Sequence, residues 1–280
     1  MQHTVTTNDG VPIVCDVHES SAGNAESAPT VLLIHGWSGS RRYFDPIVPH
    51  LVSAGCKVVA LDLRFHGDSG RPGFGYRVPR LAADVRDVLA HLNLSGVVGV
   101  GTSLGASVLW SYYELFVGER FSKMVFVDQA PLQNKVPGWE IGSTGCYDAE
   151  TLAGLRAALK ADMAQFAKEN AEACLGGVHS LPSEVDALLA QETLRCDPSD
   201  LGQLMASHTQ SDWRTVLPTI NLPCVCCVGA KTKIFPVDGV KYVGENVPDC
   251  TTVVFEDSGH WLYLEEPVRF ANLVADFAKK

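Results

Sequence analysis

The sequence predicts an α/β protein with a mostly parallel central sheet, helices on both faces of that sheet, and a helical cap. Three observations lead to this prediction. Short continuous apolar runs, typical of strands covered on both faces, alternate with helix-length amphipathic segments, as in βαβ units. One long stretch in the second half of the chain breaks this alternation. The chain has 280 residues, 46% of them hydrophobic, which is enough for one large core.

The elements follow one another in a regular order. Residues 4–7 and 12–18 read as strands, and Asn8-Asp9-Gly10 between them favours the tight turn of a β-hairpin. A polar connection at 20–28 follows. Continuous apolar runs predict further strands at residues 30–34, 57–61, 97–100, 123–127, 223–228 and 251–255. Amphipathic segments predict helices at residues 43–53, 80–92, 104–117, 239–246 and 261–278.

The stretch that breaks the alternation contains no convincing strand. It holds helix-like segments at 149–174, 182–194 and 198–207, separated by loop signals at Gly176-Gly177 and Asp197-Pro198. We therefore expect a core domain of residues 1–131 and 217–280. A helical cap of residues 132–216 would be inserted between the sixth and seventh strands. Such a cap would cover the carboxyl ends of the strands, where open α/β sheets bind their ligands.

Charge and hydropathy narrow the possible partners. The formal net charge of −10 argues against a nucleic-acid partner and against an anionic membrane surface. No apolar run reaches the roughly 20 residues of a membrane span, and the first nine residues are too polar for a signal peptide. We expect a cytoplasmic protein with a small-molecule substrate and no nucleic-acid or membrane partner. The sequence does not indicate an oligomeric state.

The chain has nine cysteines, which could serve redox chemistry or metal binding, and one pair matches C-x-x-C. That pair, Cys224 and Cys227, lies on a predicted buried strand, where the two side chains point to opposite faces. We therefore expect thiols in the core of the protein. Neither clustered metal ligands nor a G-x-G-x-x-G turn after a strand is present, so no metal and no cofactor is predicted.

The strongest catalytic signal is Gly101-Thr-Ser103-Leu-Gly105, which matches G-x-S-x-G. It follows an apolar strand and precedes an apolar helix, which is the context of a nucleophile elbow. In that turn the small flanking residues allow a sharp bend and leave the serine accessible to substrate. The pattern predicts Ser103 as a nucleophile.

Three further motifs accompany the elbow: His35-Gly36-Trp37, the segment from Asp62 to Ser69, and Asp257-Ser-Gly259-His260-Trp261. Together they resemble the α/β-hydrolase fold superfamily, in the branch that contains non-haem haloperoxidases and small esterases. The resemblance covers nearly the whole chain. It implies an oxyanion hole built from the backbone N–H groups of Trp37 and Leu104.

The resemblance also places the catalytic base after the last strand. Chain order in the family runs Ser, acid, His, and His260 is the last of the nine histidines. His35 and His66 belong to structural loop motifs, and other histidines fall in helices or the cap. We predict that His260 deprotonates the serine.

The acid is where this sequence departs from the family pattern. The usual position, after the seventh strand, corresponds to Thr232, which cannot hold an imidazolium by charge. Asp128 ends the sixth strand, where some members of the fold carry their acid. Asp238 is a second possibility, although an aspartate in a first helical turn also stabilises the helix. We favour Asp128. A site without any triad acid is the third possibility.

The predicted function is hydrolysis of a carboxylic ester or lactone through an acyl-serine intermediate. A small-molecule receptor on a hydrolase scaffold is a second hypothesis, supported by the missing acid at Thr232. Hydrolysis of a C–C bond or a thioester is a third. Fold analogy does not separate these, because function resides in the site and not in the scaffold.

Overall fold

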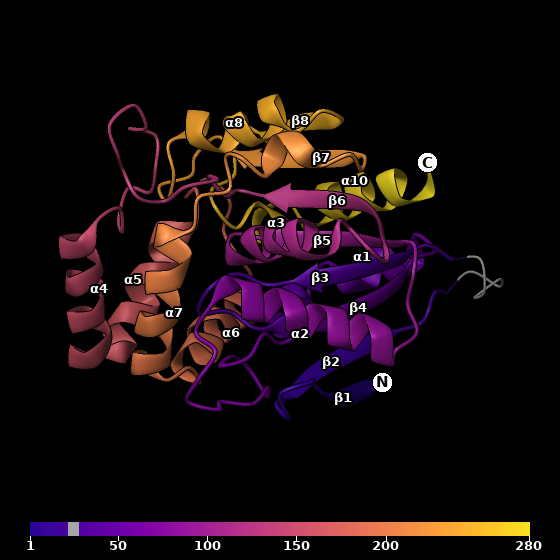
Figure 1. Cartoon of the computed structure of the whole chain (residues 1–280), viewed down its shortest axis with the longest axis horizontal. Coiled ribbons are helices and arrows are strands. Elements are labelled where there is room, and N and C mark those ends of the chain that lie inside the picture. Colours follow the sequence, from indigo (N-terminus) through magenta and orange to yellow (C-terminus); the bar gives the residue numbers. More distant parts are fainter. Residues whose placement is uncertain (22–27) are drawn as a thin grey trace.

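The computed structural model describes residues 1–21 and 28–280 (Figure 1). Within these residues one eight-stranded sheet forms the centre of the protein. Its strands are β1 (Gln2–Thr6), β2 (Pro12–His18), β3 (Thr30–Ile34), β4 (Lys57–Leu61), β5 (Val97–Thr102), β6 (Phe121–Val127), β7 (Cys224–Gly229) and β8 (Cys250–Phe255). Their order is β1-β2-β4-β3-β5-β6-β7-β8, and all neighbours from β4 to β8 are parallel. The predicted α/β fold with a mostly parallel sheet is confirmed.

The N-terminal hairpin forms at the predicted place. β1 pairs antiparallel with β2, with Thr6 opposite Pro12, and Gly10 adopts a φ of 84° in the turn. This positive φ favours glycine because a Cβ would be strained there. Of the polar connection predicted at 20–28, residues 22–27 lie outside the described part of the chain.

Two of the predicted helices are interrupted in the structure. The helix expected at 43–53 is a 3₁₀ turn, η2 (Arg41–Phe44), followed by α1 (Val48–Ser53). Pro46 lies between them and cannot donate a helical hydrogen bond. The helix expected at 261–278 is α9 (Leu262–Glu265) and α10 (Pro267–Lys279). The break falls at Glu266, because the ring of Pro267 disfavours helical geometry in the residue before it.

The sheet separates two hydrophobic cores. Leu32 and Ile34 of β3 pack on one face with α2 (Val78–His91), α3 (Leu104–Phe116) and α8 (Val237–Asn246). Val31 and Leu33 face the other way and pack with α1, α9 and α10. This alternation explains the continuous apolar runs, because successive side chains enter different cores. Cys224 and Cys227 also lie in different cores, on opposite faces of β7.

Four helices between β6 and β7, here called the cap helices, lie beyond one end of the sheet. They are α4 (Ala149–Ala161), α5 (Met163–Cys174), α6 (Ser183–Leu194) and α7 (Pro198–Gln210). Figure 1 shows them at the end toward which the arrow of β6 points, and both views show the chain termini at the other end. The single helix predicted at 149–174 is broken at Asp162, whose side chain caps α5 by accepting the N–H of Gln165. Among the described residues, no helix combines the length and apolar character needed to cross a bilayer.

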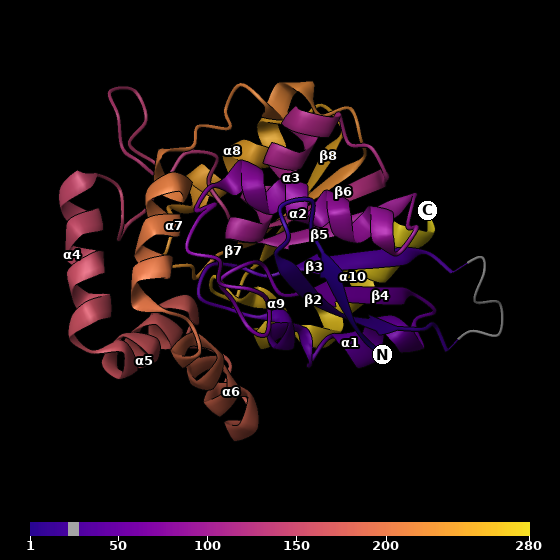
Figure 2. The same ribbon diagram turned by 60° about the horizontal axis from the view of Figure 1, so that its bottom comes forward.

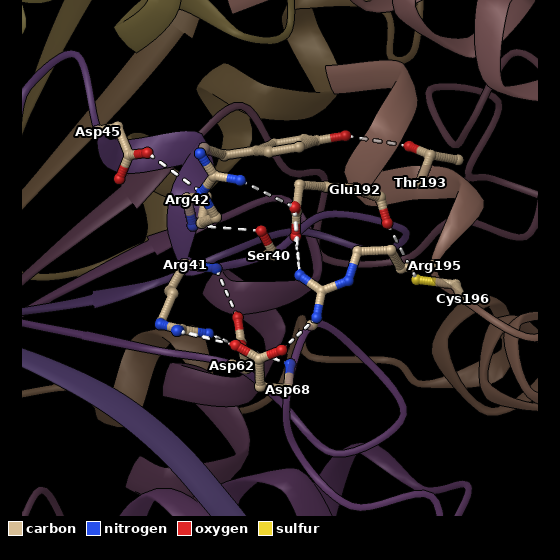
Figure 3. A network of polar contacts seen from close by, with 12 residues as sticks. Ser40, Arg41, Arg42, Asp45, Asp62, Asp68, Glu192, Thr193, Arg195 and Cys196 are labelled. Carbon is tan, nitrogen blue, oxygen red and sulfur yellow. Dashed lines mark hydrogen bonds and ion pairs between the residues drawn. The ribbon is translucent and has the colours of Figure 1, made fainter. Parts of the chain in front are cut away.

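A network of charged side chains joins the cap helices to the core (Figure 3). Arg195, at the end of α6, pairs with Glu192 at 2.9 Å and with Asp68 in the loop after β4. Asp68 also pairs with Arg41 at 2.9 Å, and Arg41 pairs in turn with the fully buried Asp62. The network fixes the C-terminal end of α6 against the loops that follow β3 and β4.

Candidate active site

Ser103 lies in a strained turn between β5 and α3. Its φ of 52° and ψ of −119° are unusual for a residue with a side chain, as a nucleophile elbow requires. The flanking glycines explain how the turn packs. A Cβ on Gly101 would lie 2.3 Å from the carbonyl oxygen of Gly105, and one on Gly105 would lie 2.2 Å from that of Ile34. Only glycine therefore fits at both positions.

Asp128 and His260 form a buried pair. Asp128 directly follows β6, has a φ of 44°, and is fully buried. Its Oδ2 lies 2.7 Å from His260 Nδ1. The other oxygen, Oδ1, accepts the N–H of Gly229 at 3.0 Å. These contacts orient the imidazole with Nδ1–H toward the carboxylate, which leaves Nε2 as the atom that can accept a proton.

Thr232, at the usual position of the family acid, takes part in the same group. Its Oγ1 donates to Asp128 Oδ2 at 2.7 Å, so it supports the carboxylate instead of replacing it. Asp238 is exposed in the first turn of α8. No hydrogen bond joins it to His260 within the described part of the chain. The structure thus brings Asp128 to the histidine and leaves Asp238 away from it.

The loop that carries His260 is attached to the cap helices. Glu265 accepts the N–H of Gly259 at 2.6 Å with one carboxylate oxygen and the N–H of Gly176 at 2.9 Å with the other. Gly176 follows α5, so one carboxylate holds both segments. Burial raises the pKa of Glu265, an effect that these two N–H donors partly offset. A Cβ on Gly259 would lie 2.5 Å from the nitrogen of Gly176, so the two backbones approach closely.

Ser103 donates its hydroxyl to Gln129 and not to His260. The distance from Ser103 Oγ to Gln129 Oε1 is 3.4 Å, and Gln129 donates its own amide to the carbonyl of Ala130 at 2.8 Å. No hydrogen bond between Ser103 and His260 is present in residues 28–280. Both side chains nevertheless line one cavity of about 260 Å³. Catalytic hydrogen bonds often tighten only when substrate binds.

The two segments that carry the backbone groups expected in the oxyanion hole meet beside the serine. β3 and β5 are neighbours in the sheet, so Trp37 after β3 and Leu104 after Ser103 meet at the same edge. A Cβ on Gly36 would lie only 3.1 Å from Ser103 Cβ, which shows how closely the loop approaches. Among the described residues, neither N–H group donates to a carbonyl or a side chain. Both are therefore available to an oxyanion.

Two buried histidines hold the loop that carries Trp37. His35 Nε2 accepts the N–H of Leu63 at 3.0 Å, and His66 Nε2 accepts the N–H of Ser38 at 3.2 Å. Burial lowers the pKa of His35 to about 4 and that of His66 to about 3. Both are neutral near pH 7, as their accepting nitrogens require, and neither contacts Ser103.

The cavity lies between the core and the cap helices. Its lining comprises Gly36, Trp37, Ser103, Gln133, Ser143, Thr144, Gly145, Cys146, Leu155, Phe166, Asn170, Ala173, Cys174, Met205, His208, Lys233, Ile234, Phe235, His260 and Trp261. The Trp37 indole donates to the carbonyl of Leu201 in α7 at 3.0 Å and meets the Phe166 ring edge-on. No three His, Cys, Asp or Glu side chains of the described residues gather as metal ligands.

Two polar residues near the serine, Gln129 and His208, were not predicted as site residues from the sequence. Gln129 directly follows Asp128, and its position next to the predicted acid is the sequence feature that could have identified it. His208 follows Leu201, Leu204 and Met205 at helical spacing, and all four side chains are buried. The sequence therefore shows a histidine within an otherwise apolar stripe of a helix, but it does not show which residues surround that histidine in the folded protein.

Comparison with known proteins agrees with this architecture. Residues 29–267 match the sequence pattern described as the alpha/beta hydrolase fold. The chain is 26% identical over 255 residues to the AB hydrolase superfamily protein YisY of Bacillus subtilis, covering 89% of this chain and 91% of that protein. An esterase from Exiguobacterium antarcticum superposes with a TM-score of 0.91 at 22% identity, and a bromoperoxidase from Bacillus anthracis with 0.90 at 22% identity. Both structures are matched over 100% of each chain.

Proposed function

Because the chain belongs to the α/β hydrolase fold family, we propose that it is a serine hydrolase that cleaves a carboxylic ester or lactone. The observation that carries the proposal is that His260, paired with the buried Asp128, lines the same cavity as the strained Ser103. Esterases among the similar structures agree with this class of reaction. The mostly apolar cavity wall favours a neutral ester over a charged one.

In this mechanism Ser103 Oγ attacks the carbonyl carbon of the ester. His260 Nε2 takes the hydroxyl proton as the bond forms, and Asp128 stabilises the resulting imidazolium at Nδ1. The carbonyl oxygen becomes an oxyanion held by the N–H groups of Trp37 and Leu104. Collapse of the tetrahedral intermediate expels the alcohol, which takes the proton from His260, and leaves an acyl-serine.

The second half of the reaction repeats these steps with water. His260 removes a proton from a water molecule as that water attacks the acyl carbon. The intermediate then collapses, Ser103 regains its proton from His260, and the carboxylic acid leaves. In each cycle the Ser103 hydroxyl turns from Gln129, its present acceptor at 3.4 Å, toward His260.

The proposal is tested by hydrolysis of p-nitrophenyl acetate and butyrate. We expect Ser103→Ala to lower kcat/KM by at least about 10⁴-fold, because the acyl-enzyme cannot form. Mass spectrometry of quenched wild type should show one added butyryl group on the peptide that contains Ser103. Ser107→Ala, one turn further along α3 and also buried, is the matched control and should stay active. Full activity in Ser103→Ala, or acylation of another peptide, would contradict the proposal.

A further inference from the structure

His208 is a buried imidazole in the wall of the active-site cavity that the proposed mechanism does not use. It lies on α7, is 2% exposed, and lines the cavity with Ser103 and His260. Neither ring nitrogen has a hydrogen-bond partner among the described residues. Because nearly all buried polar side-chain atoms in proteins are paired, two unpaired nitrogens in a residue of the cavity wall point to a partner that binds in the cavity. Both nitrogens have almost no accessible surface in this structure, so the ring must rotate to present one of them to that partner.

The charge state of His208 limits what that partner is. Burial, together with the positive charge that His260 can carry, lowers the pKa of His208 to about 3. The ring is therefore neutral near pH 7 and offers one N–H donor and one acceptor. A neutral imidazole in this setting gives a carboxylate or an ammonium group no opposite charge. It suits a ketone oxygen or a hydroxyl group.

Besides His208, the buried amide of Gln133 also lines the cavity, whereas most other polar side chains of the wall already have partners. Ser143 and Thr144 already donate to the carbonyl of Ile234, and Asn170 donates to Ser38 at 3.4 Å. Lys233 is exposed and donates to the carbonyl of Glu172. The side chains around these groups are mostly apolar, including Leu155, Phe166, Met205, Ile234, Phe235 and Trp261.

We propose that His208 binds a ketone or hydroxyl group of the substrate, so that the enzyme selects compact esters or lactones with an apolar frame and one such neutral polar group. The proposal rests on the proposed function, since it assigns the substrate class of the same site. The cavity, at about 260 Å³, is slightly smaller than the roughly 300–1,000 Å³ of drug-sized ligand sites, which agrees with a compact substrate.

Two matched pairs of esters test the proposal on either side of the scissile bond. On the acyl side, the p-nitrophenyl ester of 4-oxopentanoic acid is compared with that of 4-methylpentanoic acid. On the alcohol side, 5-acetoxypentan-2-one is compared with 4-methylpentyl acetate. In each pair a carbonyl oxygen replaces a methyl group of similar size. The quantity measured is the ratio of kcat/KM within a pair, in wild type, His208→Leu and His208→Gln.

Comparing this ratio between proteins cancels the intrinsic reactivity of the esters. We expect the ratio in at least one pair to fall about tenfold in His208→Leu, the change that corresponds to one neutral hydrogen bond. His208→Gln retains a donor and an acceptor and should keep most of the preference. A role of His208 in packing alone would lower kcat/KM for both esters of a pair and leave their ratio unchanged.

Binding of the intact esters to Ser103→Ala, measured by calorimetry, separates failure of this proposal from failure of the proposed function. Turnover of both esters with equal ratios in wild type and His208→Leu would overturn the role of His208 and leave the hydrolase intact. Absence of turnover in wild type, with binding of the oxo ester that depends on His208, would overturn the proposed function alone. Absence of both turnover and His208-dependent binding would overturn both.

Discussion

Replacing Asp128 by asparagine is the sharpest test of how the site is built. The amide has the size of the carboxylate, and its oxygen can still accept the N–H of Gly229. Its NH₂ group then takes the place of the oxygen that lies 2.7 Å from His260 Nδ1. Because two donors cannot share a hydrogen bond, Nδ1 must become the acceptor, and the ring proton moves to Nε2.

A histidine protonated at Nε2 cannot accept the proton of Ser103. The variant also loses the negative charge that stabilises the imidazolium. From the loss seen when a triad aspartate becomes asparagine, we expect kcat to fall about 10⁴-fold, or about 5 kcal/mol of transition-state stabilisation. Because the fold of the loop after β6 is preserved, KM should change much less than kcat.

The contact of Thr232 provides a second arm of the same experiment. Thr232 Oγ1 and His260 Nδ1 both lie 2.7 Å from the same oxygen of Asp128. An aspartate at 232 reaches one bond further than the threonine hydroxyl and can present a carboxylate to Nδ1. We therefore expect Asp128→Asn/Thr232→Asp to regain at least about tenfold of the lost kcat, because the charge partner is restored.

The assay is steady-state hydrolysis of p-nitrophenyl butyrate between pH 6 and 9, with urea unfolding to confirm that each variant is folded. Asp238→Asn is the matched control, because it removes an exposed carboxylate from the first turn of α8. It should remain within about twofold of wild type, since surface changes of this kind are small. Retention of more than a tenth of the activity in Asp128→Asn, or a comparable loss in Asp238→Asn, would refute this reasoning.

Three further predictions concern the surroundings of the triad. Gly36→Ala places a Cβ 3.1 Å from Ser103 Cβ and should displace the Trp37 N–H, lowering kcat about 10- to 100-fold; unchanged kcat would contradict the placement of the oxyanion loop. His208 stays neutral in the folded protein down to a pKa of about 3, whereas in the unfolded protein it protonates near pH 6.5. Between these values the unfolded state binds more protons, so the free energy of unfolding decreases as the pH is lowered. In urea unfolding from pH 7.5 to 4.5, the free energy of unfolding should depend equally on pH in wild type and His208→Gln above about pH 6.5. Well below that pH the slope should be shallower in His208→Gln by up to about 1.4 kcal/mol per pH unit; parallel curves throughout would refute this. Gly259→Ala should destabilise by about 1–3 kcal/mol, because its Cβ meets backbone at 2.5 Å, whereas Gly154→Ala, with no atom within 4 Å, should stabilise α4 by about 0.5–1 kcal/mol; equal effects in thermal unfolding would argue against the close approach at Gly259.

The central strands, β3 to β7, were predictable because their successive side chains enter two cores, which requires a largely apolar run. The helix interruptions at Pro46 and Glu266 have causes that are visible in the sequence, although the amphipathic pattern continued across them. The break at Asp162 depends on a side chain that caps α5, and a continuous helix would have had the same periodicity. Helix boundaries of this kind are set by competition between local contacts, which periodicity does not register.

The candidate triad was accessible from sequence because its three members each follow a parallel strand. Carboxyl ends of such strands meet at one edge, so Ser103, Asp128 and His260 were expected to lie together. In the structure Ser103 and His260 line one cavity, and Asp128 is bonded to His260 behind the cavity wall. His208 comes from a cap helix instead. Its distance from the sheet depends on how α7 packs, and no strand register determines that. Thr232 and Asp128 do follow neighbouring parallel strands, but the direction of the threonine hydroxyl depends on the loop after β7, which the sequence pattern does not determine.

Glu265 has a kinetic consequence beyond holding two loops. Its carboxylate joins Gly176, two residues after α5, to Gly259, the residue before His260, so a displacement of α5 would be transmitted to the histidine loop. In the proposed mechanism, we therefore expect substrates that fit the cap poorly to slow proton transfer as well as to bind weakly. Such an enzyme would discriminate between substrates through kcat as much as through binding affinity. Directed evolution of the cap for new substrates would then need to compensate at the histidine loop, even where no cap residue contacts the reacting atoms.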